Sequence, residues 1–249
     1  MIDRAAILLC DIAEYGNVGI SSDATVGELL SNMHKSEKGA VVVIEGRKQP
    51  VGILTERDAV RLLYDGVDLN EPVRKFATKT VITAMGDRTT GYAMDLMLEN
   101  NIRRLVVVDE TGIFLGLVTQ QDLLVHLEEE FYRTTIKAKH IRDQVRDLIN
   151  ASPGESIESI LEKMIKENIS AVPILQKGKL VGIITEKDIL GLANRKVSFG
   201  DKVGLYMTSP VESVEMETKL VDIVKILNSK NIRRVVLCDE KGMAVGIIT

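Results

Sequence analysis

A short pattern of residue types that could contact a nucleotide recurs along the 249-residue chain. Each complete copy has a glycine, two apolar residues, a threonine and an aspartate three residues after the threonine. The copies are Gly52–Asp58, Gly116–Asp122 and Gly182–Asp188. Glycine lets another group approach the backbone, a helix N-terminus offers amides to a phosphate, and a fixed carboxylate can accept the hydroxyls of a ribose. The combination favours nucleotide binding.

The same pattern has a purely structural explanation. Threonine at the end of a strand, with an acid three residues later, forms a capping box at the start of the next helix. Ser, Asn or Asp could cap a helix equally well, yet all three complete copies keep Gly-apolar-apolar-Thr before the acid. The repetition favours the functional interpretation, and capping remains the alternative.

The pattern marks an internal repeat that covers the chain. Its tetrapeptide recurs at intervals of 64, 66 and 64 residues, as Gly52–Thr55, Gly116–Thr119, Gly182–Thr185 and Gly246–Thr249. Asn101–Arg104 is repeated 130 residues later, so the second copy resembles the fourth more than its neighbours. We therefore predict a duplicated pair of units. The predicted boundaries are 1–65, 66–130, 131–195 with a linker helix, and 196–249, which is truncated at its C-terminus.

Each unit shows the same order of local signals. Apolar residues at helical spacing predict an amphipathic helix in the first, third and fourth copies. They are Val26, Leu29, Leu30 and Met33, then Ile157, Ile160, Leu161, Met164 and Ile165, then Leu220, Ile223, Val224 and Leu227.

Short apolar runs flank each predicted helix. Leu105–Val108 and Ile113–Val118 are separated by a turn, and they are apolar enough for strands that are covered on both faces. Val81–Thr83 and Val211–Val214 precede the helices of their units. Each unit is therefore predicted as β-α-β-β-α, and a longer helix from about Gln120 to about Val145 is predicted to join the two halves.

This order, with the threonine and aspartate at the last strand-to-helix junction, resembles the cystathionine beta-synthase (CBS) domain, whose units work in pairs called Bateman modules. The resemblance implies an α/β (α+β) tandem CBS-pair fold, in which four β-α-β-β-α repeats pack as two pseudo-symmetric modules. It also implies that adenosine-containing ligands bind between paired units and regulate an attached or associated protein. AMP, ADP, ATP and S-adenosylmethionine are such ligands.

The resemblance assigns roles to the recurrent residues. The phosphate-side hydroxyl falls on Thr55, Thr119 and Thr185, and the ribose-binding acid falls on Asp58, Asp122 and Asp188. Thr249 matches the fourth hydroxyl, but the corresponding acid would lie after the last residue given. We expect the natural chain to continue past this point.

Basic and small residues complete the candidate site. Two arginine pairs stand at the start of a strand in copies 2 and 4, as Arg103, Arg104, Arg233 and Arg234. They are either solvated strand ends or planar forks for phosphate, since adenylate-sensing members of the family, including the gamma subunit of AMP-activated kinase, hold phosphate with basic side chains near this position. Ser170 and Ala171 resemble the family's contacts near ribose and base. Thr78 and Thr208 resemble a threonine that reaches phosphate, and they are equally compatible with ordinary turns.

Composition excludes several other classes of function. The net charge of −4 argues against a nucleic-acid partner, and two Cys with three His supply neither a disulfide framework nor a metal site. No apolar run approaches the ~20 residues of a membrane span, so we predict a cytoplasmic protein. No catalytic constellation is visible, which predicts a regulatory module and not an enzyme. The alternatives are a ligand-free oligomerisation scaffold and the sensory N-terminal part of a larger signalling enzyme, and a homodimer is possible.

Overall fold

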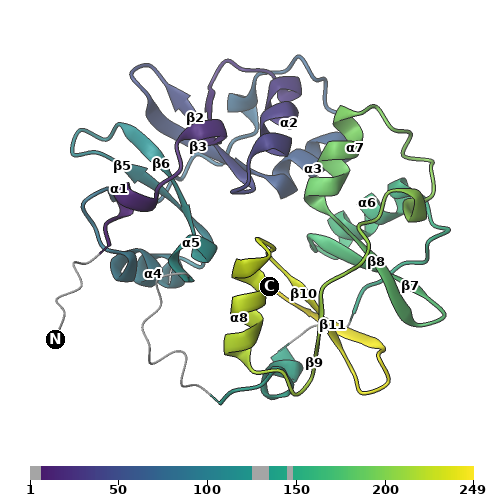
Figure 1. Cartoon of the computed structure of the whole chain (residues 1–249). Helices are drawn as coiled ribbons and strands as arrows, with labels where there is room; N and C mark the ends of the chain where they lie inside the picture. Colours follow the sequence, from purple (N-terminus) through teal and green to yellow (C-terminus); the bar gives the residue numbers. More distant parts are fainter. Residues whose placement is uncertain (1–6, 125–134, 145–147) are drawn as a thin grey trace. The chain divides into compact units, whose positions relative to one another are not determined.

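The computed structural model describes residues 7–124, 135–144 and 148–249 (Figure 1). The chain divides into two compact units, Met1–His126 and Leu127–Thr249. Each unit contains two of the four repeats, so the predicted duplicated pair corresponds to the two units. No helix within the described ranges is long and apolar enough to cross a bilayer.

The first unit begins with a short helical segment and continues with two α/β repeats. The segment is α1 (Leu9–Ile12) followed by the 3₁₀ turn η1 (Gly16–Val18). The first repeat contains β1 (Gly19–Ser21), α2 (Val26–Lys35), β2 (Ala40–Glu45), β3 (Gln49–Thr55) and α3 (Glu56–Tyr64). After η2 (Val73–Lys75), the second contains β4 (Thr83–Met85), α4 (Thr90–Glu99), β5 (Arg104–Val108), β6 (Phe114–Thr119) and α5 (Gln120–Leu124).

The second unit repeats this order. Its first helical element within the described ranges is the 3₁₀ helix η4 (Ala138–Gln144). The third repeat contains α6 (Ile157–Lys166), β7 (Ala171–Gln176), β8 (Lys179–Thr185) and α7 (Glu186–Asn194). After η5 (Val203–Leu205), the fourth contains β9 (Ser213–Glu215), α8 (Leu220–Ser229), β10 (Val235–Cys238) and β11 (Ala244–Ile248).

Each repeat combines helices with a small sheet, which confirms the α/β class. The sheets β1-β2-β3, β4-β5-β6 and β9-β10-β11 join one parallel and one antiparallel pair. The third repeat has only the antiparallel pair β7-β8, and a parallel bridge from Ala151 to Ile174 takes the place of its first strand. The predicted β-α-β-β-α order is therefore complete in the first two repeats, whereas the third lacks its first strand and the fourth is described as far as β11.

The predicted first strands lie slightly later than expected. Only Thr83 of Val81–Thr83 belongs to β4, and β9 begins at Ser213, near the end of Val211–Val214. The parallel register explains the shift, because Thr83 is the first residue that pairs with β5, opposite Val106. Strand length here depends on the partner strand and not on the apolar run alone.

Apolar side chains join the two repeats of each unit. Val42 of the first repeat packs with Val106, Phe114 and Leu117 of the second in one buried cluster. In the second unit, the corresponding cluster joins the two repeats through Ala171, Ile183, Val236 and Cys238. Burial raises the pKa of the Cys238 thiol, as expected for a thiol inside a core. The predicted face of α2 is also confirmed, since Val26, Leu29, Leu30 and Met33 are all buried, and in the predicted faces of α6 and α8 only Ile165, Leu220 and Val224 are half-buried.

The segment before the first repeat packs on the second repeat. Leu9 N donates to Arg88 O at 2.8 Å and Cys10 N donates to Gly86 O at 2.9 Å. Leu9 is fully buried with α4, β5 and β6 side chains such as Met97 and Leu105. The core of the second repeat is therefore completed by residues that precede the first repeat in the chain.

The segment before the third repeat is bonded to the fourth repeat in the same way, and this pairing contradicts the predicted linker helix. Ala138 N donates to Thr218 O at 2.8 Å and Lys139 N donates to Met216 O at 2.9 Å, in the way that Leu9 and Cys10 bond the second repeat. Thr135 and Ile136 are not helical and 138–144 is a 3₁₀ helix, so a continuous helix from 120 to 145 is wrong in this part. Pairing with the fourth repeat replaces the expected helical hydrogen bonds. Residues 125–134 of that prediction lie outside the described ranges.

Leu9→Ala should lower the free energy of unfolding of the first unit by about 2–5 kcal/mol, because it leaves a cavity in the core of the second repeat. Leu98→Ala is the matched control, since Leu98 is 64% exposed and should change stability by less than about 0.5 kcal/mol. Urea denaturation followed by circular dichroism measures both. Similar small losses in the two variants would contradict the packing of α1.

Candidate functional site

The recurrent threonines and aspartates form closed capping boxes. Thr55 N and Thr55 Oγ1 each donate to Asp58 Oδ2 at 2.7 Å, and Asp58 N donates back to Thr55 Oγ1 at 3.4 Å. The boxes at Thr119 and Asp122 and at Thr185 and Asp188 have the same bonds within 0.1 Å. Thr249 follows β11 and is exposed. The structural explanation of the pattern is therefore correct at all three complete copies.

Capping occupies only one oxygen of each carboxylate. In all three boxes that oxygen is Oδ2. Within the described ranges, Oδ1 of Asp58 and Oδ1 of Asp188 accept no hydrogen bond. Since a carboxylate has about four acceptor positions, each of these two acids can cap its helix and still accept a hydroxyl. Capping and ligand binding are compatible at the same residue.

The glycine of the pattern is required by the chain itself. A Cβ at Gly52 would lie 2.7 Å from Ala77 Cβ, and one at Gly116 would lie 2.9 Å from Ala13 Cβ. At Gly182 the crowding comes from Met207. The group that approaches each glycine is therefore the segment that crosses the strand, and no ligand is needed to explain the glycine.

The crossing segments bring Thr78 and Thr208 to two of the boxes. Thr78 exchanges two backbone hydrogen bonds of 3.0 Å with Ile53, two residues before Thr55. Thr208 pairs with Ile183 in the same way, at 3.0 and 2.8 Å. Both threonines are exposed. They come from the linkers that lead into the second and fourth repeats, so both repeats of a unit contribute to each of these sites.

At the box of Asp122 the crossing residue is Glu14. It pairs with Leu117 through hydrogen bonds of 3.2 and 2.9 Å, as Thr78 pairs with Ile53. Glu14 thus occupies the position that Thr78 and Thr208 hold at the other boxes. The 64-residue offset of the repeat relates both Glu14 to Thr78 and Leu117 to Ile53, so the sequence contained the signal that would have identified Glu14.

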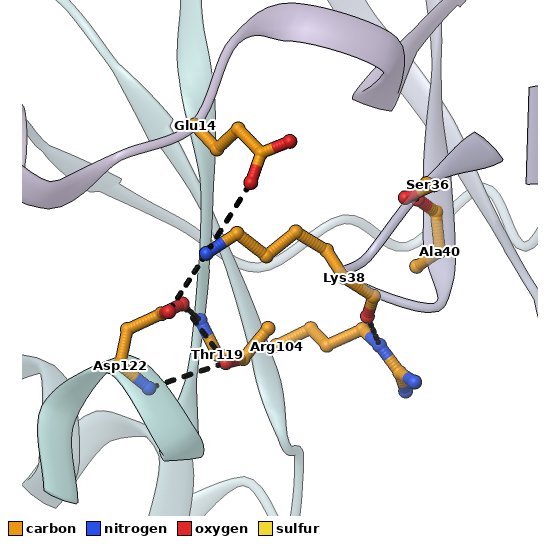
Figure 2. A network of polar contacts seen from close by, with 7 residues as sticks. All are labelled: Glu14, Ser36, Lys38, Ala40, Arg104, Thr119 and Asp122. Carbon is orange, nitrogen blue, oxygen red and sulfur yellow. Dashed lines mark hydrogen bonds and ion pairs between the residues drawn. The ribbon is translucent and has the colours of Figure 1, made fainter. Parts of the chain in front are cut away.

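The box of Asp122 also contains a lysine that the sequence pattern did not identify. Lys38 Nζ lies 2.7 Å from Asp122 Oδ1 and 3.5 Å from Glu14 Oε2. Arg104 Nε donates to Lys38 O at 2.8 Å. Figure 2 shows these side chains converging between the two repeats of the first unit. The structure therefore brings Thr119, Asp122 and Arg104 together, as predicted, and adds Glu14 and Lys38.

The second arginine of each pair contacts the partner repeat. Arg234 Nη1 donates to Ser170 O, which also accepts from Glu186 N at 3.1 Å. Arg104 likewise bonds a carbonyl just before the first strand-paired residue of its partner repeat, but one residue earlier, at Lys38 O. Ala171 is buried and pairs with Thr185.

The first arginine of each pair lies beside the second. Arg103 is exposed and Arg233 is half-buried. Each pair therefore adds positive charge where the two repeats of its unit meet. In the part of the chain that the structure describes, no three His, Cys, Asp or Glu side chains are grouped to hold a metal ion.

Comparison with known protein families finds the same four repeats along the chain. The profile of the CBS domain matches four times, at residues 11–65, 73–129, 139–194 and 202–249. The chain belongs to the CBS domain family. The predicted boundaries at 65, 130 and 195 stay a prediction.

Relatives of this CBS protein include two uncharacterised proteins of Methanocaldococcus jannaschii. MJ1225 is 29% identical over 191 residues, which cover 72% of this chain and 68% of that protein. MJ1404 is 30% identical over 187 residues, which cover 73% of this chain but only 42% of that protein. The crystal structure of MJ1225 matches with a TM-score of 0.81 and 24% identity, over 98% of this chain and 97% of that one. The tandem CBS-pair fold is therefore shared along the described chain.

Thr185→Ala should lower the free energy of unfolding of the second unit by about 0.5–2 kcal/mol, because it removes the side-chain oxygen that caps α7. Thr185→Ser keeps that oxygen and should retain most of the stability. Urea denaturation of both variants measures the difference. Equal losses would show that the methyl group of Thr185, and not its hydroxyl, is what stabilises the junction.

Proposed function

We propose that this CBS protein is a regulatory module that binds an adenine nucleotide or S-adenosylmethionine between paired repeats and signals to an attached or associated effector. It needs no catalytic activity of its own for this role. Binding would act through differential affinity, since a ligand held by two repeats stabilises the arrangement in which both contact it.

The observation that carries the proposal is the unused oxygen of Asp58 and of Asp188. A carboxylate that is held rigidly by its own capping box, with Oδ1 left to accept hydrogen bonds, is preorganised for the two hydroxyls of a ribose. In this proposal Thr78 and Thr208, whose backbones pair two residues before the capping threonines, supply a hydroxyl from the linker to the partner repeat. A helix cap alone does not require such a hydroxyl from another repeat.

The arginines supply the charge that a phosphate would need. In this proposal Arg104 and Arg234 lie where the repeats of each unit meet, and Arg103 and Arg233 stand next to them. Guanidinium groups stay protonated at physiological pH and match the geometry of phosphate oxygens. The hydroxyls of Thr55, Thr119, Thr185 and Thr249, and the backbone at Ser170 and Ala171, complete the proposed contacts.

A ligand-free scaffold is the second candidate, and a specific observation favours it. Every capping box is closed, and each pattern glycine is explained by the crossing segment. The two candidates differ in what they predict for added ligand, so binding measurements distinguish them. The effector, a homodimer and the cytoplasmic location stay predictions.

A cognate adenine ligand at one hundred times its dissociation constant should raise the free energy of unfolding by about 2.7 kcal/mol, if it binds only the folded state. Thermal melts with adenosine, AMP, ADP, ATP and S-adenosylmethionine measure the stabilisation on protein that is first shown to carry no ligand. No shift with any of the five would support the scaffold.

Asp188→Ala should weaken adenosine and its phosphates alike, by about tenfold or more, because it removes a charge-assisted hydrogen bond to the ribose that both share. Arg234→Ala should instead narrow the difference in affinity between adenosine and AMP. Glu158→Ala is the control, since Glu158 is an exposed first-turn acid of α6 outside the junction. Isothermal titration calorimetry measures all three. Unchanged nucleotide affinity in Asp188→Ala would show that this acid only caps its helix.

A further inference from the structure

Asp122, the acid of the second repeat, differs from Asp58 and Asp188 because a lysine side chain already donates to its second oxygen. Asp122 Oδ2 accepts from Thr119 N and Oγ1 at 2.7 and 2.8 Å, and Asp122 Oδ1 accepts from Lys38 Nζ at 2.7 Å. The lysine side chain is only 13% exposed and that of Asp122 is 23% exposed. Both oxygens of this carboxylate are therefore engaged, whereas Asp58 and Asp188 leave Oδ1 without a partner in the described residues.

Only the first repeat has a lysine at this position. Lys38 lies two residues before the strand-start position that Ala40, Arg104, Ala171 and Arg234 share. The residues at the corresponding position of the other three repeats are all isoleucines, Ile102, Ile169 and Ile232. The crossing residue also differs, because Glu14 stands where the boxes of Asp58 and Asp188 have Thr78 and Thr208. Two departures from the repeat, of opposite charge, thus meet at the same acid.

The loop that carries Lys38 is held in place by several hydrogen bonds. Ser36 is fully buried and its Oγ donates to Ala40 O at 3.3 Å. Gly39 has a φ of 64°, which glycine adopts without strain, and its carbonyl accepts from Glu56 N at 3.1 Å. With Arg104 bonded to Lys38 O as well, the backbone at residue 38 is fixed (Figure 2). The lysine head is therefore the part of this loop that can move.

We infer that Lys38 is an internal counter-ion that closes the Asp122 site, so that a ligand must displace its ammonium group before Asp122 Oδ1 can accept both hydroxyls of a ribose. This inference rests on the proposed function, since it assumes that Asp122 would otherwise bind a ribose as Asp58 and Asp188 do. The three acids are then unequal. The sites of Asp58 and Asp188 are open in the ligand-free protein, and the site of Asp122 is autoinhibited.

Glu14 gives the displaced ammonium group a second acceptor. Its carboxylate lies 3.5 Å from Lys38 Nζ and is 38% exposed, so it competes with Asp122 for the same cation. A ribose that takes Asp122 Oδ1 would leave Lys38 paired with Glu14 instead of unpaired in a half-buried environment. Removing the charge of Lys38 should therefore raise the affinity for adenosine, whereas removing the charge of Glu14 should lower it.

The test isolates Asp122 in the full chain. Asp58→Asn and Asp188→Asn remove the charge of the two open sites while keeping an acceptor for their helix caps. In this background, Lys38→Ile introduces the residue that the other repeats have, and Lys38→Met is a second variant with a flexible apolar side chain. Lys35→Met is the control, because Lys35 is an exposed lysine in the last turn of α2, the helix that precedes the loop of Lys38. Isothermal titration calorimetry with adenosine, which has no phosphate, reports on the ribose contact.

We expect both Lys38 variants to bind adenosine about tenfold or more tightly than the background protein, since the ligand no longer competes with a charged hydrogen bond. Lys35→Met should bind as the background does. Glu14→Gln should weaken adenosine several-fold, because the displaced ammonium loses its second acceptor.

The possible failures are distinguishable. Unchanged adenosine affinity in the Lys38 variants, in a protein that binds adenosine, would overturn the inference and leave the proposed function intact. Weaker AMP binding with unchanged adenosine binding would also overturn it, because Lys38 would then be a phosphate ligand. No binding of adenosine or AMP by the unmodified protein or any variant would overturn the proposed function and this inference together.

Discussion

The crossing of one chain segment over the end of another repeat's strand is the constraint on which the rest of this structure depends. At Gly52, Gly116 and Gly182 the crossing backbone or side chain lies so close that a Cβ would collide with it. The backbone pairing at these points places a residue of a neighbouring segment two positions before each capping threonine. The crossing segments can pair with these strands because a glycine permits this approach.

In the proposed function, one residue of each capping box serves both stability and binding. Oδ2 of each aspartate satisfies an amide and a hydroxyl of the threonine, which fixes the carboxylate at the start of the helix. The orientation of Oδ1 is then determined by the fold and not by a ligand. A rigid acceptor loses little conformational entropy on binding, which would be the physical advantage of the proposed ribose site on a helix cap.

Small differences between repeats change the electrostatics of otherwise similar sites. In the first unit, an acid replaces the crossing threonine and a lysine replaces an isoleucine at one of the two boxes. These replacements neutralise each other in the ligand-free protein, because Lys38 lies between Asp122 and Glu14. Repeats with the same order of elements can therefore differ in the charged partners of their acids.

The sequence by itself determined the repeats, the buried faces of the helices and the capping of α3, α5 and α7, because these features depend on periodicity and on residues within a few positions of one another. Only the tertiary structure decided which repeat each connecting segment completes: Leu9 belongs to the core of the second repeat, and Ala138 pairs with the fourth instead of continuing a helix. It also decided that Lys38 meets Asp122, 84 residues away. Contacts of this kind depend on how two repeats pack face to face, and local patterns of sequence carry no information about that packing.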